Sequence, residues 1–111
     1  MDITEWLVEN YVTPQGNDIF ENWIDSLPDS KTQLIIHKRL FRFKVGNFGD
    51  CKFIGGGIFE ARIFYGPGFR IYFALPDRTT VLILMGGDKT SQNRDIEISK
   101  KNWQEYLRRT K

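Results

Sequence analysis

The sequence predicts an α+β fold: an N-terminal strand and a helical hairpin packed on a small antiparallel β-sheet, with a C-terminal helix. Apolar residues follow a helical period from about residue 19 to residue 45 and alternate with a period of two after residue 51. They return to a helical stripe over residues 92–108, which predicts a last helix at the end of the sheet. The length of 111 residues, 41% of them hydrophobic, is typical of one domain spanning 1–111.

The first part of the chain is expected to form the strand and the helical hairpin. Residues 4–12 alternate loosely between apolar and polar side chains, as strands do. Apolar residues at helical spacing then predict one helix that ends at Pro28 and a second that continues to about Val45. The residues that can cap or end these helices are Asn17 or Asp18, Pro28, Asp29 or Ser30, and Gly46 with Asn47.

The second helix is expected to separate apolar from basic side chains. Those expected to face the sheet are Leu34, Ile35, Ile36, Leu40, Phe41 and Phe43. Those expected to face mostly solvent are Lys31, Lys38, Arg39, Arg42 and Lys44. This helix would therefore supply both a packing surface and positive charge.

Beyond residue 51 the pattern predicts a three-stranded antiparallel meander. Residues 58–65 and 69–75 flank the turn Gly66-Pro67-Gly68, and residues 80–85 form the third strand. Because residues 80–85 are apolar on both faces, this strand should lie inside the sheet and be covered on both sides.

A three-residue turn decides which side chains of this hairpin share a face. Tyr65 then pairs with Phe69, and the core face carries Phe59, Ala61, Ile63, Tyr65, Phe69, Ile71, Phe73 and Leu75. The opposite face carries Glu60, Arg62, Phe64, Arg70, Tyr72 and Ala74. In this register Arg62 lies across from Tyr72, and Arg70 lies beside Phe64. A two-residue turn would instead bury Arg62 without a partner, which is costly.

Two arginines on one sheet surface have two interpretations. They can pair with carboxylates such as Glu60 or Asp88, or they can bind phosphate oxygens as planar bidentate donors. The lysines that can join the same surface are Lys52, before the hairpin, and Lys89, after the third strand. The candidate contacts for RNA are Phe64, Tyr65, Tyr72 and Lys44.

The charge distribution is uneven although the formal net charge is only +2. Residues 1–30 contain seven acidic residues and no Lys or Arg, so all 16 basic residues follow them. Such clustering can mark a surface for a polyanion, or it can be the ordinary solvated face of helices and strands.

Composition excludes several classes of site. Cys51 is the only cysteine and His37 the only histidine, so neither an internal disulfide nor a zinc site is expected, and we expect no metal and no cofactor. Gly86 and Gly87 lack the spacing of a phosphate-binding loop and are expected in a turn. No secretory signal or apolar run of membrane-spanning length is present, so a cytoplasmic protein without a membrane partner is expected.

Three ordered motifs are similar to a known family. They are the run from Gly46 to Lys52 (GNFGDCK), the stretch from Glu60 to Tyr72 (EARIFYGPGFRIY), and the stretch from Gly86 to Ile96 (GGDKTSQNRDI). Their sequences and spacing resemble the HigB-like, phage-related addiction module killer proteins of the RelE/ParE superfamily. The resemblance implies the RelE/ParE-like fold, a helical hairpin against an antiparallel sheet.

The resemblance also implies a toxin of a type II toxin-antitoxin system. Many members are ribosome-dependent mRNA endoribonucleases, or mRNA interferases, which inhibit translation and use the 2′-OH of the RNA as the nucleophile. By this resemblance, Arg70 contacts the scissile phosphate and Lys89 occupies a basic position after the third strand. Arg62 and Lys52 hold flanking phosphates or assist proton transfer. The implied partners are the ribosome, mRNA and a cognate antitoxin, in HigB-like systems a helix-turn-helix, HigA-like protein.

One departure leaves alternatives open. Nuclease members commonly carry a Tyr or His near the C-terminus, where the nearest candidates here are Trp103 and Tyr106. A lysine could act as the base only if nearby arginines lowered its pKa. The alternatives are a ParE-like toxin that poisons DNA gyrase and a nucleic-acid-binding module without catalysis.

Overall fold

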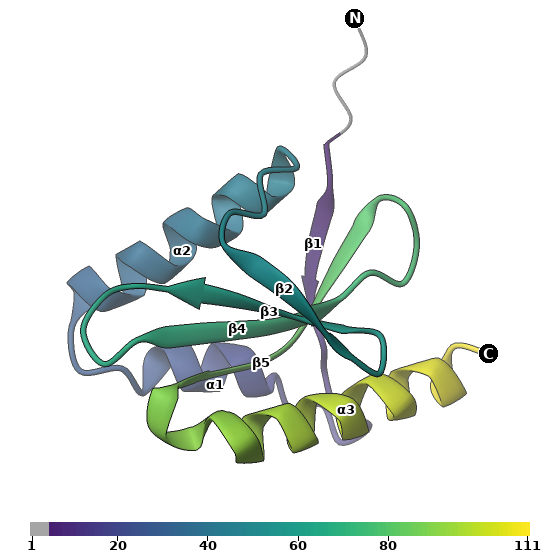
Figure 1. Cartoon of the computed structure of the whole chain (residues 1–111). Coiled ribbons are helices and arrows are strands. Elements are labelled where there is room, and N and C mark those ends of the chain that lie inside the picture. The colour runs from purple at the N-terminus through teal and green to yellow at the C-terminus, as the bar shows by residue number, and fades with distance from the viewer. Residues whose placement is uncertain (1–4) are drawn as a thin grey trace, which may run out of the picture.

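The strands form one five-stranded sheet in the order β1-β5-β4-β3-β2 (Figure 1). They are β1 (Leu7–Asn10), β2 (Cys51–Gly55), β3 (Ile58–Ile63), β4 (Phe69–Ala74) and β5 (Thr80–Asp88). The helices are α1 (Ile19–Asp25), α2 (Ser30–Lys44) and α3 (Gln92–Arg109), and the short 3₁₀ helix η1 (Lys89–Ser91) leads into α3. This computed structural model describes residues 5–111. The predicted α+β fold, with its N-terminal strand, helical hairpin and C-terminal helix, is confirmed.

The sheet differs from the predicted meander in two ways. It is mixed, because β1 runs parallel to β5 while the other pairs are antiparallel, so the expectation of a wholly antiparallel sheet was wrong. A strand that was not expected, β2, pairs with β3 and forms one edge. Residue 4, the expected start of the first strand, lies outside the described residues. As predicted, β5 lies inside the sheet, between β1 and β4.

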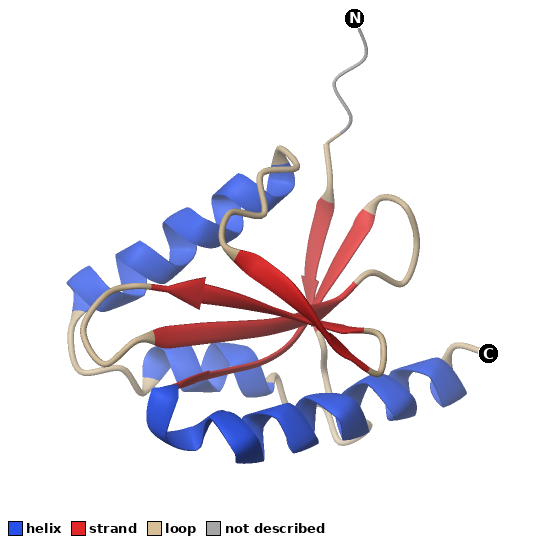
Figure 2. Ribbon diagram, viewed as in Figure 1, coloured by secondary structure: helices blue, strands red, loops and turns tan. Residues whose placement is uncertain are grey.

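Helices cover both faces of the sheet (Figure 2). On one face, Phe20 of α1 and Phe43 of α2 pack with strand residues such as Phe73 in one core. On the other face, Trp103 of α3 packs with Tyr72 and Leu84 in a second core. The prediction that the last helix lies at the end of the sheet was therefore wrong. Burying the apolar residues on this second face requires a helix across it.

The first two helices begin at aspartate caps. The Asp18 carboxylate accepts a hydrogen bond from the backbone N–H of Glu21, and Asp29 accepts one from that of Thr32. Each bond satisfies a backbone donor that the first helical turn leaves without a partner. Of the predicted alternatives, Asn17 or Asp18 and Asp29 or Ser30, the aspartate is the cap in each case.

The outward face of α2 is more apolar than expected. Ile36 and Phe43 are buried, but Leu34 and Phe41 are 53% and 66% exposed, so their expected packing against the sheet was wrong. Leu34 and Phe41 are seven residues apart, two helical turns, and therefore share one side of the helix. Val45, directly after α2, is 60% exposed and extends this apolar stripe.

Arg39 on α2 is buried, although it was expected to face solvent. Its guanidinium donates hydrogen bonds to three backbone carbonyl oxygens, at 3.0 Å to Phe48, 2.8 Å to Asp50 and 2.7 Å to Arg62. Gly49 lies so close to this guanidinium that a Cβ atom there would be 2.9 Å from it. Arg39 thus fixes the segment before β2 to the end of β3.

Gly86 and Gly87 lie within β5, so the expectation of a turn was wrong. A Cβ atom at Gly86 would collide with the ring of Trp23 from α1. A Cβ atom at Gly87 would collide with the carboxylate of Asp95 from α3. The two glycines therefore allow helices to approach the strand closely from both faces. Within residues 5–111, no helix has both the length and the apolar character needed to cross a lipid bilayer.

Candidate functional site

Arg62 and Arg70 are direct cross-strand partners in the β3–β4 hairpin. Ile63 pairs with Phe69, so the connection comprises residues 64–68, and the predicted three-residue turn was wrong. Because the difference in register is two residues, every side chain keeps its predicted face. The pairing partner changes, however, and Arg62 faces Arg70 instead of Tyr72.

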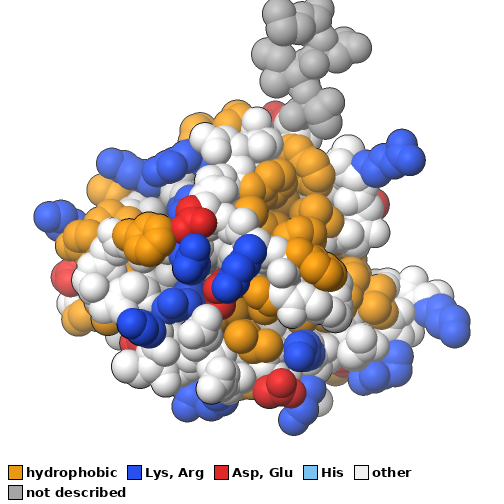
Figure 3. All heavy atoms as spheres, in the orientation of Figure 1, with side chains coloured by type: hydrophobic (Ala, Val, Ile, Leu, Met, Phe, Trp, Pro, Cys, Tyr) orange, Lys and Arg blue, Asp and Glu red, His pale blue; other side chains and the backbone are white. Residues whose placement is uncertain are grey.

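These arginines border an open cavity of about 490 Å³ at the tip of the hairpin, which we call the cationic cavity. Its lining residues include Arg62, Arg70 and Lys89, with Phe64 and Tyr65 from the connecting loop. Figure 3 shows Lys and Arg side chains gathered on this side of the molecule, with acidic side chains among them. The structure thus brings together five of the residues predicted from sequence.

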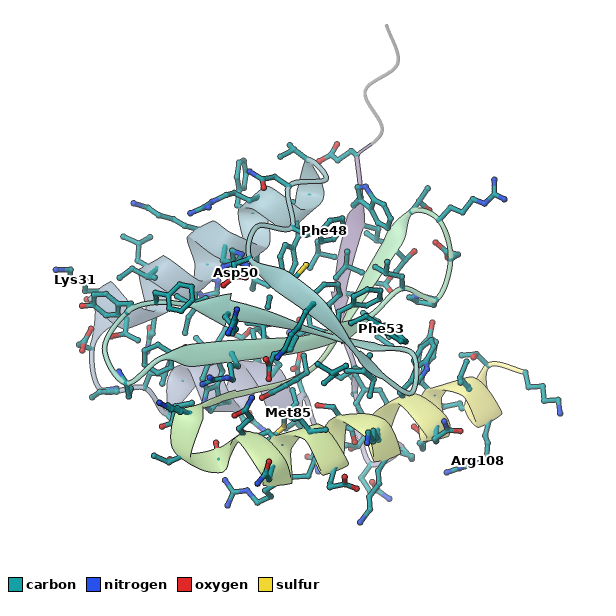
Figure 4. All side chains as sticks on the ribbon, viewed as in Figure 1. Lys31, Phe48, Asp50, Phe53, Met85 and Arg108 are labelled. Carbon is teal, nitrogen blue, oxygen red and sulfur yellow. The ribbon has the colours of Figure 1, made fainter. Side chains whose placement is uncertain are left out.

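Arg62 is the more accessible of the two arginines. Its side chain is 38% exposed, and its Nε lies 3.4 Å from Oδ2 of Asp50, a residue directly before β2 (Figure 4). The Arg62 guanidinium also lies 5.6 Å from the ring centroid of Phe64, which is 80% exposed. An exposed ion pair of this kind contributes little to stability, so Arg62 can exchange Asp50 for another anion.

Arg70 is held more tightly and is only 13% exposed. Its Nε lies 3.7 Å from Oε2 of Glu60, and its Nη1 donates a hydrogen bond to the carbonyl oxygen of Gly68 at 3.3 Å. Arg62 therefore reaches solvent, whereas most of Arg70 is covered. Both predicted interpretations are compatible with this geometry, because each arginine has a carboxylate neighbour and both reach the same cavity.

Glu60 is a buried carboxylate beside the cationic cavity. It is 1% exposed, and its Oε2 accepts a hydrogen bond from Nε2 of Gln92 at 2.8 Å. Its Oε1 accepts no hydrogen bond from any other residue in 5–111. Sequence reasoning missed this contact because it depends on α3 crossing the sheet next to β3.

Tyr72 cannot contact an RNA base in this structure, contrary to the sequence prediction. It is fully buried in the second core, since α3 covers the face that was expected to be open. Burial, followed by the nearby charge of Glu60, raises the pKa of Tyr72. Asp95 is also buried there and accepts a hydrogen bond from Ser91, and burial raises its pKa.

The remaining candidate residues lie outside the cationic cavity. Lys52 is exposed on β2, opposite Glu60, and is not among the cavity's lining residues. Lys44 is at the end of α2 and lines grooves beside Val8 of β1. Trp103 and Tyr106 stack on each other on α3, with ring centroids 5.7 Å apart, and neither lines the cavity.

The described residues do not form a metal-binding cluster. Within 5–111, no three His, Cys, Asp or Glu side chains are grouped so that they could hold an ion. The cavity places the cations Arg62, Arg70 and Lys89 together, and the buried carboxylate of Glu60 lies beside Arg70. Such an arrangement can bind and stabilise a phosphate-like anion.

A comparison with known sequences places the chain among relatives. No family model matches the sequence. An uncharacterized protein of Haemophilus influenzae is 40% identical over 81 residues, which are 73% of this chain and 82% of the Haemophilus protein. At this identity and coverage, the chain belongs to the same family as the Haemophilus protein.

Proposed function

We propose that this protein is a HigB-like toxin of the RelE/ParE superfamily that cleaves mRNA on the ribosome. The supporting observation is the convergence of Arg62, Arg70 and Lys89 on one open cavity bordered by aromatic rings. Positive charge provides affinity for the RNA backbone, and exposed rings provide surfaces on which bases can stack. Because ribosomes are in the cytoplasm, the protein would act there.

The proposed reaction is a transesterification within the RNA that consumes no second substrate. The 2′-oxygen of the RNA attacks the adjacent phosphorus and releases its proton to water, while the bond from phosphorus to the 5′-oxygen breaks and that oxygen takes up a proton from water. The products are a 2′,3′-cyclic phosphate and a 5′-hydroxyl end. Negative charge develops on the phosphoryl oxygens in the transition state, and Arg70, Arg62 and Lys89 would stabilise it. Lys52 would hold a flanking phosphate.

Primer extension on a translated transcript after induction tests this proposal. The wild-type protein should produce discrete cuts within the translated region, and Arg70→Ala should abolish them. The matched control is Arg78→Ala, because Arg78 is exposed in the loop between β4 and β5, at the other end of β4 from the cationic cavity. Accumulated gyrase–DNA breaks would instead support a ParE-like toxin. Unaffected growth would support a binding module without catalysis.

The proposed partner is a cognate antitoxin of the helix-turn-helix, HigA-like type. The outward face of α2 offers it a surface, because the exposed stripe of Leu34, Phe41 and Val45 has no other partner within residues 5–111. The basic residues exposed around this stripe are Lys31, Lys38, Arg42 and Lys44. Since residues 30–45 include no acidic residue, an acidic amphipathic helix would complement both the charge and the apolar stripe.

Neutralisation of toxicity tests this surface. Phe41→Ser should weaken rescue by the co-expressed antitoxin while leaving mRNA cleavage intact. Phe53→Ser is the matched control, because Phe53 is 60% exposed on β2, away from α2. Equal rescue of Phe41→Ser and the wild type would exclude α2 as the docking surface.

A further inference from the structure

A second cavity, of about 620 Å³, lies next to the cationic cavity. It opens between the turn from α1 to α2 and the β3–β4 loop, and we call it the apolar groove. The two cavities share Tyr65, Gly66 and Pro67 in their linings. A ligand that enters one can therefore extend over the loop into the other.

The two cavities differ in their charged groups. Arg62, Arg70 and Lys89 line the cationic cavity, and no carboxylate from residues 5–111 does. Among the described residues, Asp29 and Asp88 are the charged groups that line the apolar groove, and no Lys or Arg joins them. A phosphate would be attracted to the first cavity and repelled from the second.

Apolar surfaces in the groove suit a flat, uncharged group. Leu27 and Pro28 contribute from the helical hairpin, and Pro67 and Phe69 from the β-hairpin. Tyr65 stands at the boundary, where Nζ of Lys31 lies 5.8 Å from its ring centroid, and Figure 4 shows Lys31 beside this loop. Nucleobases stack on aromatic and apolar side chains of this kind.

Asp88 gives the groove a carboxylate that acts only as a hydrogen-bond acceptor. Its Oδ1 accepts hydrogen bonds from the backbone N–H and the hydroxyl of Thr90, at 2.8 Å and 2.6 Å. These bonds hold the pKa of Asp88 below its ordinary range, so it remains an ionised acceptor near neutral pH. A carboxylate has about four acceptor positions, so Asp88 can accept further bonds from a ligand.

We propose that the apolar groove binds the base of a nucleotide whose phosphate lies in the cationic cavity, with a preference for bases that carry an amino group. Guanine, adenine and cytosine can donate an amino N–H to Asp88. Uracil has no amino group, and its one edge donor, N3–H, lies between two carbonyl oxygens that the carboxylate repels. This inference rests on the proposed RNA-cleaving function and adds a determinant of sequence preference to it.

Equilibrium binding of short, non-cleavable RNA tests the inference. The probes are fluorescently labelled 2′-O-methyl hexanucleotides with five uridines and one variable base. Because one hydrogen bond to a charged group contributes about 1.5–3 kcal/mol, guanine, adenine or cytosine should bind at least about tenfold more tightly than uracil. Asp88→Asn should reduce this ratio toward one, since the Asn amide can donate to a uracil carbonyl.

Two further variants show whether a change in base preference comes from the carboxylates of the groove or from the loss of any negative charge. Asp77→Asn is the matched control, because Asp77 accepts hydrogen bonds from Thr79 in the β4–β5 loop much as Asp88 does from Thr90. It should keep the wild-type ratio. If Asp88→Asn lowers the melting temperature, Asp29→Asn removes the other carboxylate of the groove and should also reduce the ratio.

The possible failures can be told apart. Equal binding of all four hexanucleotides, with loss of affinity in Arg70→Ala, would overturn the base-binding groove while retaining the proposed function. A preference that survives both Asp88→Asn and Asp29→Asn would also overturn it. Absence of binding to every hexanucleotide, with no cleavage of translated mRNA, would overturn the proposed function itself.

Discussion

Arg62 on β3 and Arg70 on β4 face each other directly across an antiparallel pair, on the same face of the sheet. Like charges in directly opposed positions destabilise a sheet by roughly 0.2–1 kcal/mol. Asp50 and Glu60 offset part of this repulsion from the two sides. An anion bound between the arginines would offset more of it, so the pair is arranged to gain stability when a ligand binds.

Removing one of these two charges should lower RNA cleavage without lowering the free energy of unfolding. Arg62→Gln should leave the free energy of unfolding unchanged or raise it by up to about 1 kcal/mol, because the repulsion disappears and the exposed ion pair contributes little. RNA cleavage should fall in the same variant. Urea unfolding and primer extension measure the two effects. Asp50→Asn is the control: it also removes the exposed ion pair but leaves the two arginines opposed, so the free energy of unfolding should not rise.

The salt dependence of RNA binding should identify which lysine contacts phosphate. For single-stranded nucleic acid, the slope of log K against log salt concentration is about −0.7 for each phosphate neutralised. Lys89→Gln should therefore make the slope less negative by about 0.7. Lys44→Gln should not change it, because Lys44 ends α2 at the opposite end from Lys31, which contacts Tyr65. A reduced slope in Lys44→Gln would extend the RNA surface to that end of the helix.

Asp95 should make the protein less stable as pH rises through the acidic range. Burial raises its pKa in the folded protein above the unfolded value of about 3.9. Between these two values the unfolded chain releases the proton first, so the free energy of unfolding falls as pH increases. Asp95→Asn should lack this decrease. The difference in free energy of unfolding between Asp95→Asn and the wild type should stop growing once the carboxyl group of the folded protein is ionised. Urea unfolding at a series of values from pH 3 to pH 7 measures the free energy of unfolding of both proteins, beginning below the unfolded pKa of about 3.9.

Asp88 should contribute a pH dependence of stability opposite in sign to that of Asp95, and Asp88→Asn should remove it. Hydrogen bonds from Thr90 lower the pKa of Asp88 in the folded state, so its stabilising contribution is present above the unfolded pKa. That contribution should be lost as pH falls through the folded pKa. If both variants shifted stability in the same direction with pH, the assignment of these two carboxyl groups would be wrong.

Gly86→Ala should destabilise the protein by about 1–3 kcal/mol or more, because the added methyl group meets the Trp23 ring from α1. Trp23→Leu in the same chain should recover part of the loss by making room for it. Thermal unfolding of the two single variants and the double variant measures the coupling between these positions. Strict additivity would mean that Trp23 is not the obstacle.

The sequence was sufficient to predict which face of the hairpin each side chain occupies, but not the register in which the two strands pair. Alternation of apolar and polar residues fixes which side each residue faces, and a shift of two residues preserves that alternation. The choice between residues 66–68 and 64–68 as the loop depends instead on backbone geometry. Gly66 and Gly68 both have positive φ, and Tyr65 closes the turn by accepting a hydrogen bond from the backbone N–H of Gly68. These contacts leave no periodic signal.

The position of α3 was also beyond sequence reasoning, and with it the burial of Tyr72. The apolar stripe of α3 indicates that the helix packs on something, but not on which surface. The apolar character of β5 on both faces already indicates a second covered face. Tyr72 and Ala74 of the neighbouring strand β4 share that face and are buried with it. Arg39 was missed for a related reason, since its acceptors are backbone carbonyls, which every residue carries.

The contacts of Arg39 bear on how this family could change its substrate over evolutionary time. The guanidinium holds the segment before β2 and the end of β3 through main-chain oxygens alone. Substitution of the side chains at positions 50 and 62 would leave those anchors in place. Under the proposed function, the side chains that would meet the RNA could therefore diversify among homologues while the supporting backbone keeps its path. Loss of Arg39 itself would be tolerated less well.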